Sequence, residues 1–355
     1  MSARWSLVLS VGGLVAGGLL AAPPATAAPL CSVEQNMVSA DQYWVANGTD
    51  TASNNWENSA FHVGNLAMVR TTGVTNHVTL PWADANMYQL ATDPNQPFRA
   101  DDDAVGEAYL ALQFFHPIPA NLQALRDRIA AEDASVQQGH NQYWNNPDAL
   151  NFAMPSFAQI GVLDDSQADL ETMHTLFEFT RTHLFNQFVG LWRDNASGTT
   201  FPSRGNGQAF AALAKVLATL PATDPHRAEY TQVFQRMAFT LLLLQRNDGF
   251  WNVDLTNPFD HPGPETSGTA LFTYGLAWGV DNHVLPAWLY TPAVRRAWNG
   301  MVTTALQPSG LLGFVQGQAT GPTGGAPVTA TDTAAYGVGY FLLAGQQVAQ
   351  LTPGC

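Results

Sequence analysis

The stretch Thr269-Ala-Leu-Phe-Thr-Tyr-Gly-Leu-Ala277 carries no charged side chain and is apolar nearly all round when it is wound as a helix. A helix without a polar face must be buried on all sides. Three further stretches are similarly apolar and rich in glycine and alanine, which permit close helix contacts: residues 104–112, 207–214 and 336–344. Together these stretches predict an inner layer of buried helices.

A second kind of segment alternates with the first and is amphipathic. Residues 122–129, 169–177 and 228–237 each carry one apolar stripe and one charged face. About twelve helical segments, six of each kind, follow one another, and sustained strand periodicity is nearly absent. We therefore expect an all-α fold, an (α/α)6 barrel of six helical hairpins with the apolar helices inside. A helical solenoid is the main alternative, but it would leave its inner row partly exposed.

The beginning of the chain predicts secretion. Arg4 precedes an apolar run that ends near Ala21, and Ala25-Thr26-Ala27 supplies the small residues that a signal peptidase reads. We expect residues 1–28 to be a cleaved signal peptide and residues 29–355 to form a single barrel domain. The mature protein is then extracellular and is not held in a membrane.

The two cysteines stand near the two ends of this predicted mature chain, as Cys31 and Cys355. In an oxidising compartment such a pair predicts a disulfide bond. A bond between the ends also favours closure of the barrel. Two cysteines are too few for a cysteine-based metal site, and the sequence has no zinc or haem motif, so we expect no metal and no cofactor.

The charge of the chain limits its partners. The formal net charge at pH 7 is −14, and loss of Arg4 with the leader lowers it to −15. Such an acidic protein is not expected to bind nucleic acid, which requires clustered lysine and arginine. A small anionic ligand held by one or two buried arginines remains compatible with the composition.

Polar clusters stand at the predicted starts of the six inner helices. They are residues 56–58, 101–103, 146–148, 204–206, 265–268 and 331–333. In a barrel of antiparallel hairpins all inner helices run the same way, so these starts share one rim, where the helix dipoles favour negative charge. Helix capping is the simpler explanation for any single cluster, and we expect Asp103, Ser267 and Asp332 to be caps.

Three of these clusters exceed what a cap requires. Asp101 and Asp102 are consecutive carboxylates, and their mutual repulsion could raise the pKa of one of them. Arg204 opposes the dipole at a helix start, so it needs another role, such as binding a carboxylate. Asp148 precedes the apolar residues 149–154, a setting that favours a raised pKa and acid–base catalysis.

Six segments also resemble a known family, in the same order and through nearly the whole mature chain: residues 100–110, 148–155, 191–194, 203–207, 265–270 and 336–345. The family is that of the unsaturated glucuronyl and rhamnogalacturonyl hydrolases, glycoside hydrolase families 88 and 105. The resemblance implies the same barrel and a glycosidase of polysaccharide degradation. Such an enzyme removes a 4,5-unsaturated uronic acid from the non-reducing end of lyase-generated oligosaccharides. It does so by hydrating the vinyl ether, without a metal.

The resemblance also implies roles for individual residues. Asp148 would be the acid/base, Asp101 or Asp102 the second acidic residue, and Arg204 the partner of the substrate carboxylate. The sequence departs from the family pattern at Asn146, Pro202 and Gln208, where tryptophans are usual, and at Asn151-Phe152, where Phe-Met is common. The remaining candidates for substrate binding are Asn206, Gln208, Trp144, Trp56 and His261.

Two other functions stay open on the sequence alone. One is a non-catalytic or altered-specificity barrel that binds a carbohydrate without hydrating it. The other is a hydrolase of the same fold that uses two carboxylates on an ordinary glycosidic bond.

Overall fold

The computed structural model describes residues 30–317 and 328–355 of the chain. The predicted signal peptide, residues 1–28, lies outside the described residues. Most of the described residues are helical, and helices make up nearly all of the regular structure. The exceptions with regular structure are a two-residue antiparallel hairpin, β1 (Phe185–Asn186) with β2 (Leu191–Trp192), and three isolated bridges. The prediction of an all-α fold is therefore confirmed.

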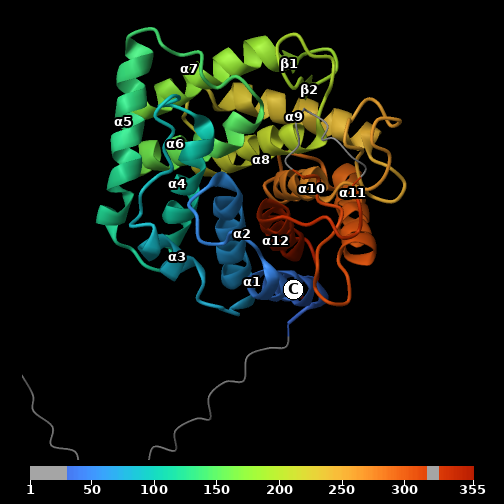
Figure 1. Ribbon diagram of the computed structural model, residues 1–355. Coiled ribbons are helices and arrows are strands. Elements are labelled where there is room, and N and C mark those ends of the chain that lie inside the picture. Colours follow the sequence, from blue (N-terminus) through green and yellow to red (C-terminus); the bar gives the residue numbers. More distant parts are fainter. Residues whose placement is uncertain (1–29, 318–327) are drawn as a thin grey trace, which may run out of the picture.

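Six buried helices form the inner ring. They are α2 (Trp56–Thr72), α4 (Ala100–Leu112), α6 (Asp148–Leu163), α8 (Ser203–Thr219), α10 (Thr266–Asp281) and α12 (Ala335–Gln350). Each packs against the next in chain order, and α12 packs against α2. Figure 1 shows these two helices side by side although they come from opposite ends of the chain. This contact closes the ring, so the barrel is confirmed and the solenoid is excluded.

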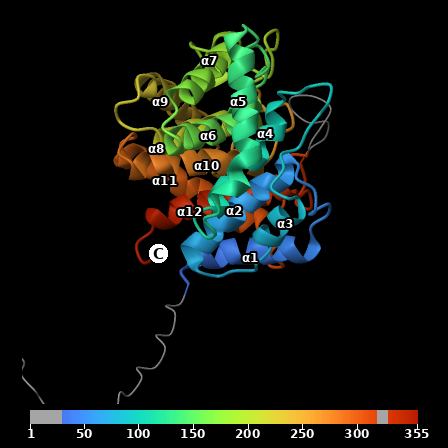
Figure 2. The same cartoon turned by 90° about the vertical axis from the view of Figure 1, so that its left-hand side faces the viewer.

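Six amphipathic helices surround the ring. They are α1 (Ser32–Asn47), α3 (Thr79–Ala85), α5 (Gln123–Gln137), α7 (Gln167–Leu184), α9 (Arg227–Leu244) and α11 (Ala287–Gly300). Each precedes the inner helix that follows it in sequence, which gives the six predicted hairpins. Short 3-10 (Pro119–Leu122) and π-helical (Met301–Ala305) turns lie next to α5 and α11. Figure 2 shows α5 on the outside of the barrel and α1 along its lower edge, beside α2.

The seam between α2 and α12 depends on two glycines. A Cβ atom at Gly64 would lie 2.2 Å from the carbonyl oxygen of Gly339. A Cβ atom at Gly339 would lie 2.1 Å from the carbonyl oxygen of Ala60. Any side chain at these positions would therefore overlap with the backbone of the neighbouring helix, and only glycine permits this approach.

The two ends of the described barrel are covalently joined. Cys31 and Cys355 form a disulfide with their Cα atoms 5.3 Å apart and 324 positions apart in sequence. The predicted bond is confirmed, and it holds the start of α1 beside the end of α12. No helix among the described residues is long and apolar enough to cross a lipid bilayer.

Candidate functional site

The starts of the inner helices meet at one end of the barrel, which we call the entrance rim. A Cβ atom at Gly205 in α8 would lie 3.0 Å from Oδ1 of Asp148 in α6. Ser203 Oγ donates a hydrogen bond to Oε2 of Glu265, the N-cap of α10 (3.2 Å). The rings of Trp56 in α2 and Tyr336 in α12 lie 4.9 Å apart. These contacts link the start of α8 to those of α6 and α10, and the start of α2 to that of α12, as the parallel inner helices predict.

Asp148 is the first residue of α6, and its Oδ1 atom is buried. Burial raises the pKa of Asp148 above its usual range, the charge of Arg204 lowers it, and the charge of Asp101 raises it. The net shift is upward, because desolvation is the largest of the three effects. Ionisation of this carboxyl group is therefore less favourable than that of a free aspartate, which suits the group to donate a proton.

Arg204 is the second residue of α8, and one nitrogen of its guanidinium group makes all of its hydrogen bonds to described residues. Its Nη1 donates hydrogen bonds to the carbonyl oxygens of Gln316 (3.1 Å) and Gly317 (3.2 Å) and to the hydroxyl of Tyr336 (3.3 Å). Its guanidinium carbon also lies 5.4 Å from the centre of the Tyr336 ring. These oxygens compensate the positive charge at a helix start, where the dipole opposes it.

Four buried polar atoms from three inner helices have no hydrogen-bond partner among the described residues. They are Oδ1 of Asp148, Nε of Arg204, Nε2 of Gln208 and the hydroxyl of Tyr340. Burial and the nearby charge of Asp148 raise the pKa of the Tyr340 hydroxyl, so it is a neutral donor. Buried polar groups almost always have partners. A ligand rich in oxygen atoms, with a carboxylate for Arg204, would supply the missing ones.

The two consecutive aspartates at the start of α4 have different environments. Asp101 pairs with Arg99 (2.5 Å) and lines a rim cavity of about 350 Å³, together with Tyr143 and Asn146. Asp102 is buried, and its Oδ2 accepts a hydrogen bond from the backbone N–H of Asp93 (3.0 Å). Only Asp101 lies on this cavity, so the geometry separates two candidates that the sequence left together.

Two predicted ligand-binding residues make their contacts within the fold, and their binding role stays a prediction. Asn206 is fully buried; its Oδ1 accepts from the Trp192 N–H (2.8 Å), and its Nδ2 donates to the carbonyl oxygens of Trp192 (2.8 Å) and Pro202 (2.9 Å). It therefore fixes β2 against α8 and has no amide atom left for a sugar. Trp144 is also fully buried and packs edge-on against Phe157 in the core.

Trp56 is half-buried at the rim, between Phe152 (5.0 Å) and Tyr336 (4.9 Å). Beneath it lies a gap of only about 10 Å³, which Lys215 also lines. Gln208 is fully buried, and its Oε1 accepts a weak hydrogen bond from Asn151 Nδ2 (3.4 Å).

His261 lies in the loop before α10, where its Nδ1 atom is 2.6 Å from a carboxylate oxygen of the adjacent Asp260. Its binding role stays a prediction.

Sequence reasoning missed Tyr336 and Tyr340. Both lie in a helix that was interpreted only as apolar and buried. Their spacing of four residues near the start of α12 places them on one face of the helix. A hydroxyl on a fully buried aromatic ring needs a partner, and this was the available signal.

The three residues expected to cap inner helices do not cap them. Asp103 forms an ion pair with Arg128 of α5 (3.1 Å). Burial raises the pKa of Asp103, and it also raises the pKa of the neighbouring Glu132 in α5. Ser267 donates to Glu265, which is the actual N-cap of α10, and Asp332 accepts from a backbone N–H of its own turn. Capping is therefore the wrong explanation at these positions.

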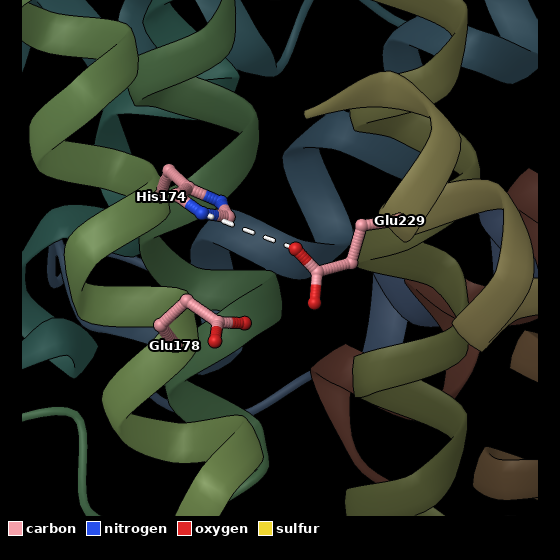
Figure 3. Close-up of side chains that lie close together, drawn as sticks. All are labelled: His174, Glu178 and Glu229. Carbon is pink, nitrogen blue, oxygen red and sulfur yellow. Dashed lines mark ion pairs between the residues drawn. The ribbon is translucent and has the colours of Figure 1, made fainter. Parts of the chain in front are cut away.

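One cluster of described residues has the composition of a metal site. His174 and Glu178 on α7 face Glu229 on α9 across the outer surface, as Figure 3 shows, with ligand atoms within 4.8 Å of one another. However, Arg181 Nε lies 2.5 Å from Glu178 and 3.1 Å from Glu229. The guanidinium already supplies the positive charge that a metal would bring. The cluster is an ion-pair network between outer helices.

Comparisons with known proteins agree with this geometry. Residues 32–352 match the model of Glycosyl Hydrolase Family 88. The unsaturated 3S-rhamnoglycuronyl hydrolase of Alteromonas sp. (strain LOR) is 27% identical over 326 residues, which cover 82% of this chain and 77% of the relative.

Two solved structures are similar along almost their whole length. A structure described as a glycosyl hydrolase family 88 protein from Bacteroides vulgatus is 31% identical, has a TM-score of 0.84, and the match covers 90% of this chain and 99% of that one. Another, described as a polysaccharide lyase, is 28% identical, has a TM-score of 0.85, and the match covers 91% of this chain and 98% of that one.

Proposed function

The chain belongs to glycosyl hydrolase family 88, and from this membership we propose that it removes a 4,5-unsaturated uronic acid from the non-reducing end of lyase-generated oligosaccharides. The observation that carries the proposal is the set of unpartnered buried atoms at the entrance rim. It combines a carboxyl group whose pKa is raised by burial with a cation suited to a uronate. A carbohydrate-binding barrel without catalysis needs no such proton donor.

The proposed reaction needs few groups. Arg204 binds the substrate carboxylate, and Tyr340 and Gln208 donate to sugar oxygens. Asp148 protonates C4 of the double bond, and its carboxylate then takes a proton from the water that attacks C5. The resulting hemiketal opens, the glycosidic bond breaks, and the remaining oligosaccharide leaves with a free hydroxyl group. Asp101 keeps negative charge beside Asp148 and supports its protonated form.

We further propose where the rest of the substrate lies. The rim cavity beside Asp101 would hold the sugar next to the uronic acid, and Tyr143 and Asn146 line it. The relative from Alteromonas is named for a rhamnose-linked substrate, so rhamnose-containing oligosaccharides are the first to test. The leader-like residues 1–28 and the disulfide support a single catalytic domain, residues 29–355, that acts outside the cytoplasm.

The test follows the absorbance of the conjugated alkene on pectic, ulvan and glycosaminoglycan fragments. The unmodified protein should consume this absorbance on at least one class. Asp148→Asn keeps the shape of the side chain but has no carboxyl proton, so it should slow turnover by about 100- to 10,000-fold. Asp102→Asn is the matched comparison, because that carboxylate does not line the rim cavity, and it should keep most of the activity.

Three outcomes would contradict the proposal. Near-normal turnover of Asp148→Asn would remove the assigned acid. A rise in absorbance on intact polysaccharide would indicate a lyase, the activity named for one structural neighbour. Saccharide binding without turnover on the whole panel would favour the carbohydrate-binding barrel.

A further inference from the structure

A second cavity lies at the end of the barrel opposite the entrance rim, and we call it the far mouth. Its volume is about 270 Å³. Every inner helix contributes a polar residue from its second half: Arg70, Glu107, Gln159, Lys215, Tyr274 and Gln346. Because all inner helices start at the entrance rim, this cavity opens on the other side of the molecule and is separate from the site described above.

A buried ion pair contributes to the lining of the far mouth. Lys215 Nζ lies 2.8 Å from Glu107 Oε1 and donates to Asn151 Oδ1 (3.1 Å). The side chains of Lys215 and Glu107 are only 9% and 13% exposed. Burying such a pair costs desolvation free energy, and apolar residues would often stabilise the fold at least as well. An ammonium group has three donors, and three oxygens, Oε1 and Oε2 of Glu107 and Oδ1 of Asn151, lie within 3.1 Å of Nζ. The pair therefore adds charge to the lining and leaves hydrogen bonding to the other groups.

The walls of the far mouth offer unused hydrogen-bonding groups. Tyr274 is only 6% exposed, and its hydroxyl makes no hydrogen bond to any described residue. The amides of Gln159 and Gln346 are half-buried and likewise make none within the described parts of the chain. Phe114 presents an exposed ring, with the Arg70 guanidinium 4.4 Å above it. Amides, a phenol, a carboxylate and an aromatic face together suit a ligand with several hydroxyls and an apolar ring face.

The charges of the far mouth favour a neutral ligand. Arg70 and Lys215 bring two positive charges, and Glu107 brings one negative charge. The C-terminal ends of the inner helices add partial negative charge at this end of the barrel, which opposes the binding of an anion. The volume is near the lower end for ligand pockets, about 300 Å³, so a small molecule fits and a polymer does not.

We propose that the far mouth is a second binding site, for a neutral sugar of one or two rings. The test is isothermal titration calorimetry of the full chain with rhamnose, galactose, glucose and xylose. The Asp101→Ala protein serves as background, because Asp101 lines the rim cavity, the other place where a neutral sugar could bind. Saturable binding at millimolar sugar should persist in this background.

Matched variants locate the binding. Tyr274→Phe removes one hydrogen bond and should weaken binding by about 2- to 10-fold. Tyr290→Phe, on α11 and outside both cavities, should leave it unchanged. Phe114→Ala alters only an exposed ring, so it should fold normally and also weaken binding.

Two results would overturn the proposal. One is the absence of saturable binding for the whole sugar panel. The other is binding that disappears in Asp101→Ala but survives in both Tyr274→Phe and Phe114→Ala, which would assign it to the entrance rim. Neither result depends on catalysis, so the proposed function is tested separately.

Discussion

At the scale of single residues, the chemistry depends on the two charged neighbours of Asp148. Arg204 and Asp101 act on its proton in opposite directions: the cation lowers the pKa of Asp148 and the anion raises it. Because Asp148 acts in its protonated form, activity should be present below its pKa and should be lost as the pH rises through it.

Removing either charge should therefore shift the pH profile of activity, in opposite directions for the two variants. Arg204→Ala should move the alkaline limb of the kcat/KM profile to higher pH, whereas Asp101→Asn should move it to lower pH. Arg204→Ala should also raise KM by about 10- to 150-fold, through loss of a charged hydrogen bond. The measurement is residual activity against pH for each variant. If both variants move the limb in the same direction, the limb does not belong to Asp148.

The sequence indicated which helix starts carry the site, but not which way each side chain points. Arg204 and Gln208 are four residues apart and share a helix face, whereas Asn206 between them points elsewhere. Applying this spacing within the cluster separates Asn206 from the other two. No such rule was available for Trp144, which precedes α6 in an irregular segment. Its burial depends on contacts from α6 and α7 that only the folded chain reveals.

At the scale of helices, the closure of the ring depends on the contact of α2 with α12. Alternation of apolar and amphipathic segments predicted the two layers. The outer helix α3 has only seven residues, too few to show a periodicity. The sequence also does not indicate which two helices close the ring. Glycines occur in most inner helices, and only the assembled ring shows which of these glycines are in contact.

We expect Gly64→Ala to destabilise the protein by at least about 1–3 kcal/mol, the usual cost of overpacking. The reason is the overlap of the new methyl group with the backbone of α12. Gly207→Ala is the matched control between α8 and α10, where the new methyl group would lie 3.0 Å from Leu271 Cβ. Gly207→Ala should lower the free energy of unfolding, measured with urea, by clearly less than Gly64→Ala. If both variants lower the free energy of unfolding equally, α2 and α12 can move apart without cost, and the close approach at Gly64 is not required.

The double variant Gly64→Ala/Gly339→Ala adds a second criterion. Both glycines serve the same contact, so once one methyl group has forced the helices apart, the second should cost little more. If the two single losses in unfolding free energy add up fully in the double variant, the two glycines do not serve the same contact.

At the scale of the whole molecule, one covalent bond joins the first and last described helices. Replacement of both Cys31 and Cys355 by serine should lower the free energy of unfolding by roughly 2–4 kcal/mol, because the unfolded chain gains freedom. The contact between α1 and α12 remains, so the variant should fold and stay active at room temperature. Thermal unfolding of the oxidised, reduced and double-serine proteins measures this. An unchanged Tm on reduction would contradict it.

The gap beneath Trp56 has a consequence for how the protein handles long substrates. At about 10 Å³ it admits no more than a single water molecule between the entrance rim and the far mouth. A glycan therefore cannot thread through the barrel. The chain end therefore enters and leaves by the same opening, the entrance rim. Each lyase-generated oligosaccharide carries one unsaturated sugar, at its non-reducing end, so the proposed reaction acts on it once. The remaining oligosaccharide has no unsaturated end and is not a substrate for a second turnover.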